Sequence, residues 1–335
     1  MKVLISFRPE RKSTPFEATR LRKNIKGALE LSGVSYVENL AASPDIVHIL
    51  SPFELDLAQE CVEEGVPYLV SALYSEEDED GSFLSGEEKG SVDLTPKAKK
   101  LLANAKAVLV PSRFAFYTLR GLGVQNPIEV VPPGVNLARF ESLNAIEYAS
   151  FARYFRFSVD AKFVLCIGRS LDENVFEGLK RLSNFAPNIR FFFIDVDYQK
   201  HEKRIKKIQK SLPKNVIVTP LLDDDLYRSA LMGATAFLIF GSPATYNELT
   251  TYEVFASKTP LVVVGGNMED ELVNRKTAYF ADGLENAAEY LVTLSPNLSS
   301  SFIIDAYKKS EEGSLKKVGE KLLHIYQSVL SKEEI

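Results

Sequence analysis

The stretch 108–140, VLVPSRFAFYTLRGLGVQNPIEVVPPGVNLARF, decides the fold of this chain. It continues an apolar run at 107–110 and contains a second one at 128–131, and both have the length of a buried strand. Between the two runs, Ser112 can cap the first N–H groups of a helix, and Gly123 can take the left-handed conformation that often ends one. The stretch therefore predicts a β-strand, a short helix and a second β-strand.

Within this predicted helix, Phe114, Tyr117 and Leu122 recur at near-helical spacing, as an apolar helix face does. After the second strand, the Pro-Pro-Gly sequence at 132–134 forbids continued strand pairing, because proline cannot donate to a sheet ladder. The chain must turn sharply there and leave the sheet. We interpret this turn as the exit from a first domain.

Apolar runs of strand length alternate with helix-length segments along both halves of the chain. Several runs are apolar almost throughout, as strands covered on both faces must be. Because 335 residues suit two domains with a core each, we predict an α/β protein with two doubly wound, Rossmann-like domains that face one another across a cleft. The expected strands are 2–7, 35–40, 45–50, 68–73, 107–110 and 128–131, then 163–167, 190–196, 216–218, 236–240, 261–264 and 277–280.

We place the domains at 1–145 and 155–300, with 141–159 as a helical linker between them. The acidic segment 74–94 has little to bury, so it is expected to be a mobile loop. The chain ends in an amphipathic helix, 314–331, and helices are also expected at 223–233 and 249–257. One face of the final helix carries Leu315, Val318, Leu322, Ile325, Tyr326 and Val329.

Composition excludes several classes of protein. Hydrophobic residues make up 45% and charged residues 25% of the chain, as in globular proteins that are soluble in water. With a net charge of −5 and dispersed basic residues, a nucleic-acid partner is not expected. The start has no signal-peptide character, so we expect a cytoplasmic protein. Cys61 and Cys166 lie far apart, and buried free thiols are the expected state of both.

The first predicted helix, 16–31, is amphipathic and basic. Its polar side carries Arg20, Arg22, Lys23 and Lys26, and Arg8, Arg11 and Lys12 lie just upstream. Such a helix can meet an anionic membrane surface at the inner face of the membrane. The alternative is an ordinary sheet-covering helix with a solvated basic side.

The run PSRFAFYTLRGLGV followed by VVPPGVN and a phenylalanine resembles the first-domain exit of a family of glycosyltransferases. These are the retaining, nucleotide-sugar-dependent enzymes of family 4 (glycosyl transferases group 1), which have GT-B architecture. The resemblance implies a metal-independent enzyme without a cofactor that binds a nucleotide diphosphate sugar in its second domain and an acceptor (a glycan, lipid or protein) in its first. It also implies that the final helix crosses back to the first domain.

The expected donor site lies in the second domain. Departure of a nucleoside diphosphate requires positive charge near its phosphates, and Gly168-Arg169 looks like the Gly-Arg of the family at the end of a strand. Glu253 looks like the glutamate of the family that accepts hydrogen bonds from the ribose hydroxyls. Gly265 and Gly266 resemble a Gly-Gly turn that lets backbone N–H groups approach the sugar.

The chain departs from the family pattern at several positions of that site. Leu73 stands where a catalytic-site histidine is expected, Glu177 replaces a lysine that holds the diphosphate, and Thr245 takes the place of an earlier glutamate. Lys258 stands in a turn where the family has glycine. If that turn needs a positive φ, the lysine carries a strain of about 1 kcal/mol.

His48 and Thr245 are the candidate catalytic residues, and Tyr74 and Gly134 are expected on the acceptor side. Without the resemblance, His48 is equally well interpreted as a hydrogen-bonded core histidine. Two further functions stay open: a catalytically inactive GT-B protein that partners an active glycosyltransferase, and a sugar-nucleotide epimerase or hydrolase. The departures at Leu73, Glu177 and Thr245 favour the inactive partner.

Overall fold

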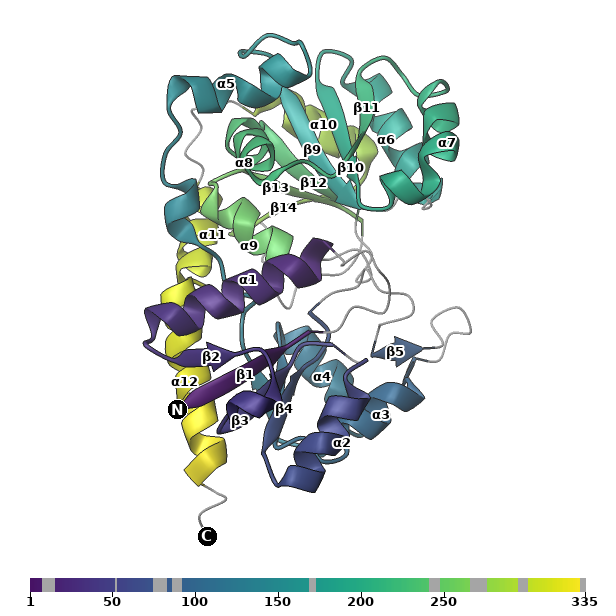
Figure 1. The fold of residues 1–335 in the computed structure, drawn as a ribbon. Helices are drawn as coiled ribbons and strands as arrows, with labels where there is room; N and C mark the ends of the chain where they lie inside the picture. Colours follow the sequence, from purple (N-terminus) through teal and green to yellow (C-terminus); the bar gives the residue numbers. More distant parts are fainter. Residues whose placement is uncertain are drawn as a thin grey trace. The chain divides into compact units, whose positions relative to one another are not determined.

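The computed structural model describes residues 1–7, 16–51, 53–74, 83–85, 92–168, 173–240, 248–265, 276–294 and 301–331. The chain divides into two compact units, each with a six-stranded parallel sheet among these residues (Figure 1). Unit 1 comprises Met1–Asn136, Asn247–Tyr252 and Glu312–Ile335, and unit 2 comprises Leu137–Tyr246 and Glu253–Glu311. The predicted fold class, two doubly wound α/β domains, is confirmed.

The strands of unit 1 are ordered β2-β1-β3-β4-β7-β8, and every pair is parallel. The order shows that the chain first moves to one side of β1, then returns and builds outward on the other side. All four residues of β3, β4 and β7 are buried, which explains why these strands read as continuous apolar runs. The strands are β1 (Lys2–Ser6), β2 (Ser35–Val37), β3 (Ile46–Ile49), β4 (Tyr68–Ser71), β7 (Ala107–Val110) and β8 (Ile128–Val130).

Helices cover both faces of this sheet. One hydrophobic core joins it to α1 (Phe16–Leu31) and α12 (Leu315–Ser331), and a second core joins it to α2 (Leu55–Glu64), α3 (Pro96–Leu102) and α4 (Arg113–Gly121). α12 lies so close to α1 that a Cβ on Gly319 would sit 2.1 Å from the backbone oxygen of Ala28. Only glycine permits this contact.

The helix α4 begins as expected but turns a different face inward. Ser112 caps it by accepting a hydrogen bond from the N–H of Ala115, and Gly123 follows with φ = 84°. Ala115 and Leu119 are buried against the sheet, whereas Phe114 and Tyr117 are exposed. The expected apolar face was therefore wrong, because the small Ala115 sits one turn before Leu119 and lets the helix pack closely on that side.

Two short segments also differ from expectation. The predicted strand 35–40 ends at Val37, and a short 3-10 helix, η1 (Leu40–Ala42), follows, capped by the side chain of Asn39. Within 74–94, β5 (Leu84–Ser85) pairs antiparallel with β6 (Asp93–Leu94). These four residues are therefore strand, and most of the acidic run, on which the expectation of a mobile loop rests, lies outside the described residues.

The strands of unit 2 are ordered β11-β10-β9-β12-β13-β14, again with every pair parallel. They are β9 (Phe163–Gly168), β10 (Arg190–Asp195), β11 (Val216–Pro220), β12 (Ala236–Phe240), β13 (Leu261–Val264) and β14 (Tyr279–Ala281). Its helices include α6 (Glu173–Phe185), α7 (Tyr198–Gln209), α8 (Asp224–Gly233), α10 (Leu284–Thr293) and α11 (Ser301–Glu312), and the division between the units falls within α9 (Glu248–Ala256). No helix in the described part of the chain is long and apolar enough to cross a bilayer.

The segment 141–159 is an integral part of unit 2 and not a linker. It contains α5 (Ala145–Tyr154), which packs against α8. Phe151 is buried among aromatic rings, with its ring centroid 5.1 Å from that of Phe163 and 4.8 Å from that of Phe192. The backbone N–H of Phe151 donates a 3.1 Å hydrogen bond to Ser229 Oγ. The break between units accordingly falls at Asn136–Leu137, ahead of the residue 145 expected from the sequence.

Candidate functional site

The carboxyl ends of β9 and β12 mark the place in unit 2 where a ligand is expected. From β9 the chain moves outward to β10 and β11, then crosses back to start β12 on the other side of β9. In open α/β sheets, ligands bind outside the carboxyl ends of the strands at such a reversal. β9 ends at Gly168, where an added Cβ would meet only an ordinary contact with Phe193, 3.4 Å away. The fold therefore does not itself require glycine at this position.

Glu253 lies in α9, the helix that follows β12, and only 4% of it is exposed. Its Oε1 is 3.9 Å from Nη1 of Arg139, which comes from the 3-10 helix η3 (Leu137–Phe140) at the start of unit 2. A buried carboxylate is costly unless it is paired. The arginine supplies an opposite charge beside the buried carboxylate.

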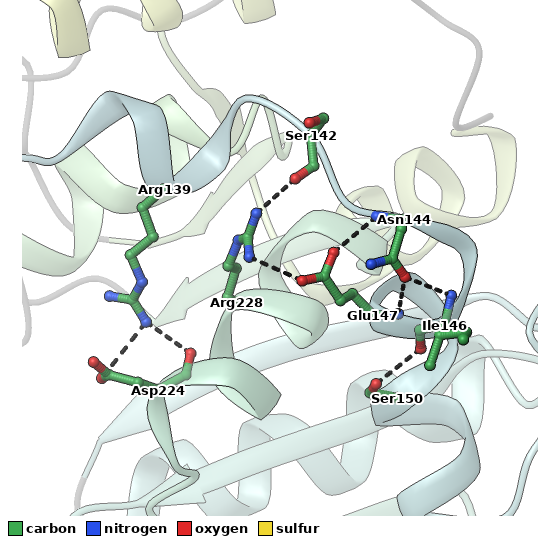
Figure 2. A network of polar contacts seen from close by, with 8 residues as sticks. All are labelled: Arg139, Ser142, Asn144, Ile146, Glu147, Ser150, Asp224 and Arg228. Carbon is green, nitrogen blue, oxygen red and sulfur yellow. Dashed lines mark hydrogen bonds and ion pairs between the residues drawn. The ribbon is translucent and has the colours of Figure 1, made fainter.

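Arg139 contacts Asp224 as well as Glu253. Its Nη2 donates a 2.7 Å hydrogen bond to the backbone oxygen of Asp224 and lies 3.5 Å from the Asp224 carboxylate (Figure 2). Asp224 is the first residue of α8. One guanidinium thus joins the start of α8 to the carboxylate of Glu253. Sequence reasoning missed Arg139, although it is the basic residue of the exit stretch that precedes Phe140.

A second arginine of similar burial makes a separate cluster in the same unit. Arg228 Nη2 donates to the backbone oxygen of Ser142 over 2.6 Å, and its Nη1 lies 3.6 Å from Glu147 (Figure 2). Glu147 also accepts from the N–H of Asn144, whose side chain caps α5 in return. This cluster fastens α5 to α8 and includes no residue of the predicted donor site.

The turn after α9 contains a residue in the left-handed conformation. Lys258 has φ = 58°, so the condition under which this lysine was expected to carry strain is met. Its ammonium lies over the ring of Tyr307, 4.6 Å from the centroid. Gly265, after β13, has φ = 73°, a left-handed conformation that favours glycine.

Several predicted donor-side residues lie outside the described part of the chain. They are Arg169, Thr245 and Gly266, and their roles stay predictions. Of the departures from the family pattern, Glu177 is described: it is exposed on α6, and Lys180 Nζ lies 3.5 Å from its carboxylate. The neighbouring Gly178 is packed so closely that an added Cβ would sit 2.7 Å from the ring of Phe240 at the end of β12.

In unit 1, His48 is fully buried in β3. Its Nδ1 is 2.8 Å from the Tyr326 hydroxyl, and its Nε2 is 2.8 Å from Ser71 Oγ. Burial lowers the pKa of His48 from 6.5 to about 3, so the imidazole is neutral. This geometry is that of a hydrogen-bonded core histidine, the alternative that the sequence left open.

The two expected acceptor-side residues take part in packing. The Tyr74 hydroxyl donates to the backbone oxygen of Val131 over 2.5 Å, and burial, reinforced by Glu248, raises its pKa well above 10. Gly134 has φ = 80°, and its carbonyl accepts a 2.7 Å hydrogen bond from Asn24 of α1. Leu73, where the family has a histidine, also has a positive φ of 61°. Non-glycine residues with a positive φ are backbone outliers, and such residues concentrate at functional sites.

A buried carboxylate that the sequence did not indicate stands near the end of β1. Glu54, just before α2, accepts a 2.6 Å hydrogen bond from Ser6 Oγ, at the carboxyl end of β1. β1 and β3 flank the reversal point of this sheet, so Glu54 occupies in unit 1 a place comparable to that of the site in unit 2. A lone glutamate before a helix gives no sequence signal by itself.

The basic side of α1 differs from expectation. Arg20 is buried, and Arg22 and Lys26 both pair with Glu38, the former over 3.0 Å. The upstream Arg8, Arg11 and Lys12 lie outside the described residues. Placing Arg20 on the solvated face was wrong, because only 8% of this residue is exposed.

The sequence is similar to that of a curated glucosyltransferase. A processive diacylglycerol alpha-glucosyltransferase of Acholeplasma laidlawii is 22% identical over 312 residues, which are 91% of each chain. No protein-family model matches the chain.

Similar solved structures cover nearly the whole chain. The Anabaena protein HepE in complex with UDP and glucose aligns with a TM-score of 0.73 and 12% identity, over 98% of this chain and all of that one. Sucrose-phosphate synthase of Thermosynechococcus elongatus aligns with a TM-score of 0.72 and 14% identity, over 99% of both chains. HepE has also been solved with UDP-glucose, with a TM-score of 0.71. The chain therefore has the GT-B fold that was expected from the sequence.

Proposed function

We propose that the chain is a retaining glycosyltransferase that takes its sugar from a nucleotide diphosphate donor bound to unit 2. One observation carries the proposal: a buried carboxylate, Glu253, stands on the helix that follows β12, one of the two strands that flank the reversal point of the sheet, and lies 3.9 Å from Arg139. An ionised carboxylate there can accept hydrogen bonds from both ribose hydroxyls. Charge-assisted bonds of this kind are about twice as strong as neutral ones.

The other donor-side residues have complementary roles in this proposal. Gly168 leaves space at the end of β9, so that the diphosphate can approach the backbone. Arg169, the next residue, provides the positive charge that the leaving diphosphate needs, and this role follows from the family resemblance. In this proposal Arg169 takes the place of a metal ion at the diphosphate, so the proposed reaction is metal-independent, as in the family that the sequence resembles.

Retention and a lipid acceptor are supported by the sequence relative. Its name describes an alpha-glucosyltransferase that acts on diacylglycerol. Formation of an α-glucoside from an α-linked nucleotide sugar retains configuration. We propose the same stereochemistry for this chain, with a membrane lipid as the acceptor.

The test is product analysis with a panel of nucleotide sugars, with and without a diacylglycerol acceptor. Release of nucleoside diphosphate that depends on the acceptor, with an α-linked product by NMR, is the expected result. Equal release without acceptor indicates a hydrolase, and conversion of the nucleotide sugar alone indicates an epimerase. Binding of a nucleotide sugar without any turnover contradicts the proposal and favours the inactive-partner function, to which the replacements at Leu73 and Glu177 point.

A further inference from the structure

The helices α3 and α4 of unit 1 carry a block of positive charge. Residues 94–128 contain six lysines and arginines and no aspartate or glutamate, in a chain whose net charge is −5. The neighbouring helix α2, which packs in the same core, carries four acids and no base. Five of these six positive charges lie on the two helices, and Lys106 lies between α3 and β7. The six residues are Lys97, Lys99, Lys100, Lys106, Arg113 and Arg120.

The outer side of α4 adds aromatic surface to this charge. Arg113, Tyr117 and Arg120 follow one another at spacings of four and three residues, which places them on one side of a helix. Tyr117 is 65% exposed, and Phe114 beside it is 49% exposed. Ala115 and Leu119 face the sheet on the opposite side. We call Arg113, Phe114, Tyr117 and Arg120 the basic aromatic face.

Contacts of α4 with its own residues and with the segment that follows it fix part of this face. Arg120 Nη1 donates a 2.7 Å hydrogen bond to the backbone oxygen of Val124, and its guanidinium lies 5.5 Å from the ring of Phe116. Phe116 meets Tyr117 edge to face, with 5.3 Å between ring centroids. The guanidinium of Arg120 and the ring of Tyr117 are thus presented together. Asp93, an acid near α3, is paired with Lys99 over 2.7 Å.

We propose that the basic aromatic face binds the surface of an anionic lipid bilayer. Aromatic rings with a polar tip and arginines with an apolar stem both reside stably at the level of lipid headgroups, where anionic lipids attract the positive charge. Nucleic acids are also anionic, but proteins bind single strands in a groove that follows the backbone. The outward side of one helix suits a flat lipid surface better than such a groove.

This surface replaces the one that the sequence suggested. On α1, Arg20 is buried and Glu38 neutralises part of the charge of Arg22 and Lys26. α1 also offers a bilayer no exposed aromatic ring among its described side chains. The proposal does not depend on sugar transfer, and its test needs no enzymatic activity.

The chain contains no tryptophan, which permits a direct test with a single fluorophore. Tyr117→Trp places tryptophan on the basic aromatic face, and Tyr154→Trp places it at an equally exposed position (65%) on α5 of unit 2. The emission of each full-length variant is recorded with vesicles of phosphatidylcholine alone and of phosphatidylcholine mixed with phosphatidylglycerol. We expect a blue shift and quenching by bilayer-embedded quenchers only for Tyr117→Trp and only with the anionic vesicles.

Sedimentation with the same vesicles tests the charges. Arg113→Gln combined with Arg120→Gln should lower partitioning about tenfold or more, and added salt should weaken binding. Tyr117→Ser, at a solvent-exposed position, should also lower it without unfolding the protein. Arg22→Gln combined with Lys26→Gln should leave it unchanged. Absence of binding to any vesicle, equal binding to neutral vesicles, loss of binding only in the α1 variant, or an unchanged emission of Tyr117→Trp on bound protein would each overturn the proposal.

Discussion

Replacement of Arg139 by alanine should weaken nucleotide binding although Arg139 itself is not expected to touch the donor. The guanidinium lies 3.9 Å from Glu253 Oε1, a separation at which two unit charges interact by about 4 kcal/mol at an effective dielectric constant of about 20. The variant also loses the 2.7 Å bond to the Asp224 carbonyl, worth about 1.5–3 kcal/mol for a charged donor. Other groups still surround the Glu253 carboxylate in the variant, and solvent screens the Arg139 side chain, which is 22% exposed. Both effects reduce the loss, so we expect the unfolding free energy to fall by about 2–4 kcal/mol.

Arg228→Ala is a matched control for this variant. The side chain of Arg228 is 20% exposed against 22% for Arg139, and it too joins a backbone carbonyl and a carboxylate. Both variants should lower the midpoint of urea denaturation. Only Arg139→Ala should also weaken the affinity for UDP-glucose, by roughly tenfold, because Glu253 then loses the charge that holds it (about 1.4 kcal/mol).

The assays are urea denaturation followed by circular dichroism, and calorimetric titration with UDP-glucose under conditions in which both variants are folded. Arg139→Lys keeps the positive charge but cannot bridge two acceptors in a fixed fork, so it should recover part of the affinity. Equal losses of affinity in Arg139→Ala and Arg228→Ala would refute the reasoning. So would an unchanged affinity in Arg139→Ala.

Three further predictions concern the stability of the units. The pKa of His48 is about 3 in the folded protein and 6.5 in the unfolded chain. Between pH 3 and pH 6.5, therefore, only the unfolded chain binds a proton at this residue. The unfolding free energy should therefore fall as the pH is lowered from 6.5 towards 3, by up to about 1.4 kcal/mol per pH unit from this group, and His48→Asn should flatten that slope in urea titrations at several pH values. Lys258→Gly should be more stable than Lys258→Ala by about 1 kcal/mol by thermal denaturation, because both lose the Tyr307 contact but only alanine keeps the strain of φ = 58°; equal stabilities would contradict this. Gly178→Ala should destabilise the protein by about 1–3 kcal/mol, since its Cβ would lie 2.7 Å from the Phe240 ring, and Gly178→Ala combined with Phe240→Leu should recover part of the loss.

The sequence predicted the elements that are buried on both faces and missed the details at their edges. The strands 107–110, 236–240 and 261–264 and the helix 16–31 have the predicted bounds, because a buried strand or an amphipathic helix has a period that the sequence displays. The expected strand 35–40 ends early instead, since the Asn39 side chain caps a 3-10 turn that competes with the sheet. Such local hydrogen bonds leave no periodic signal.

The candidate site was only partly predictable for a different reason. Glu253 was found because it sits in a stretch with a recognisable order of residues. Arg139 and Glu54 were missed, because their importance depends on partners that are distant in sequence, Glu253 and Ser6. His48 was ambiguous until the structure placed Tyr326 and Ser71 against its two ring nitrogens.

The most direct test of the central claim is calorimetric titration of UDP-glucose into the wild-type protein and into Glu253→Gln. The account predicts saturable binding to the wild type, which at a hundredfold excess over the dissociation constant should add about 2.7 kcal/mol to the unfolding free energy. Glu253→Gln removes the negative charge from an acceptor of nearly the same shape, so its affinity should be lower by about tenfold or more. If the wild type binds neither UDP-glucose nor the other nucleotide sugars of the panel, or if a folded Glu253→Gln variant binds them equally well, the claim that Glu253 holds the donor is contradicted.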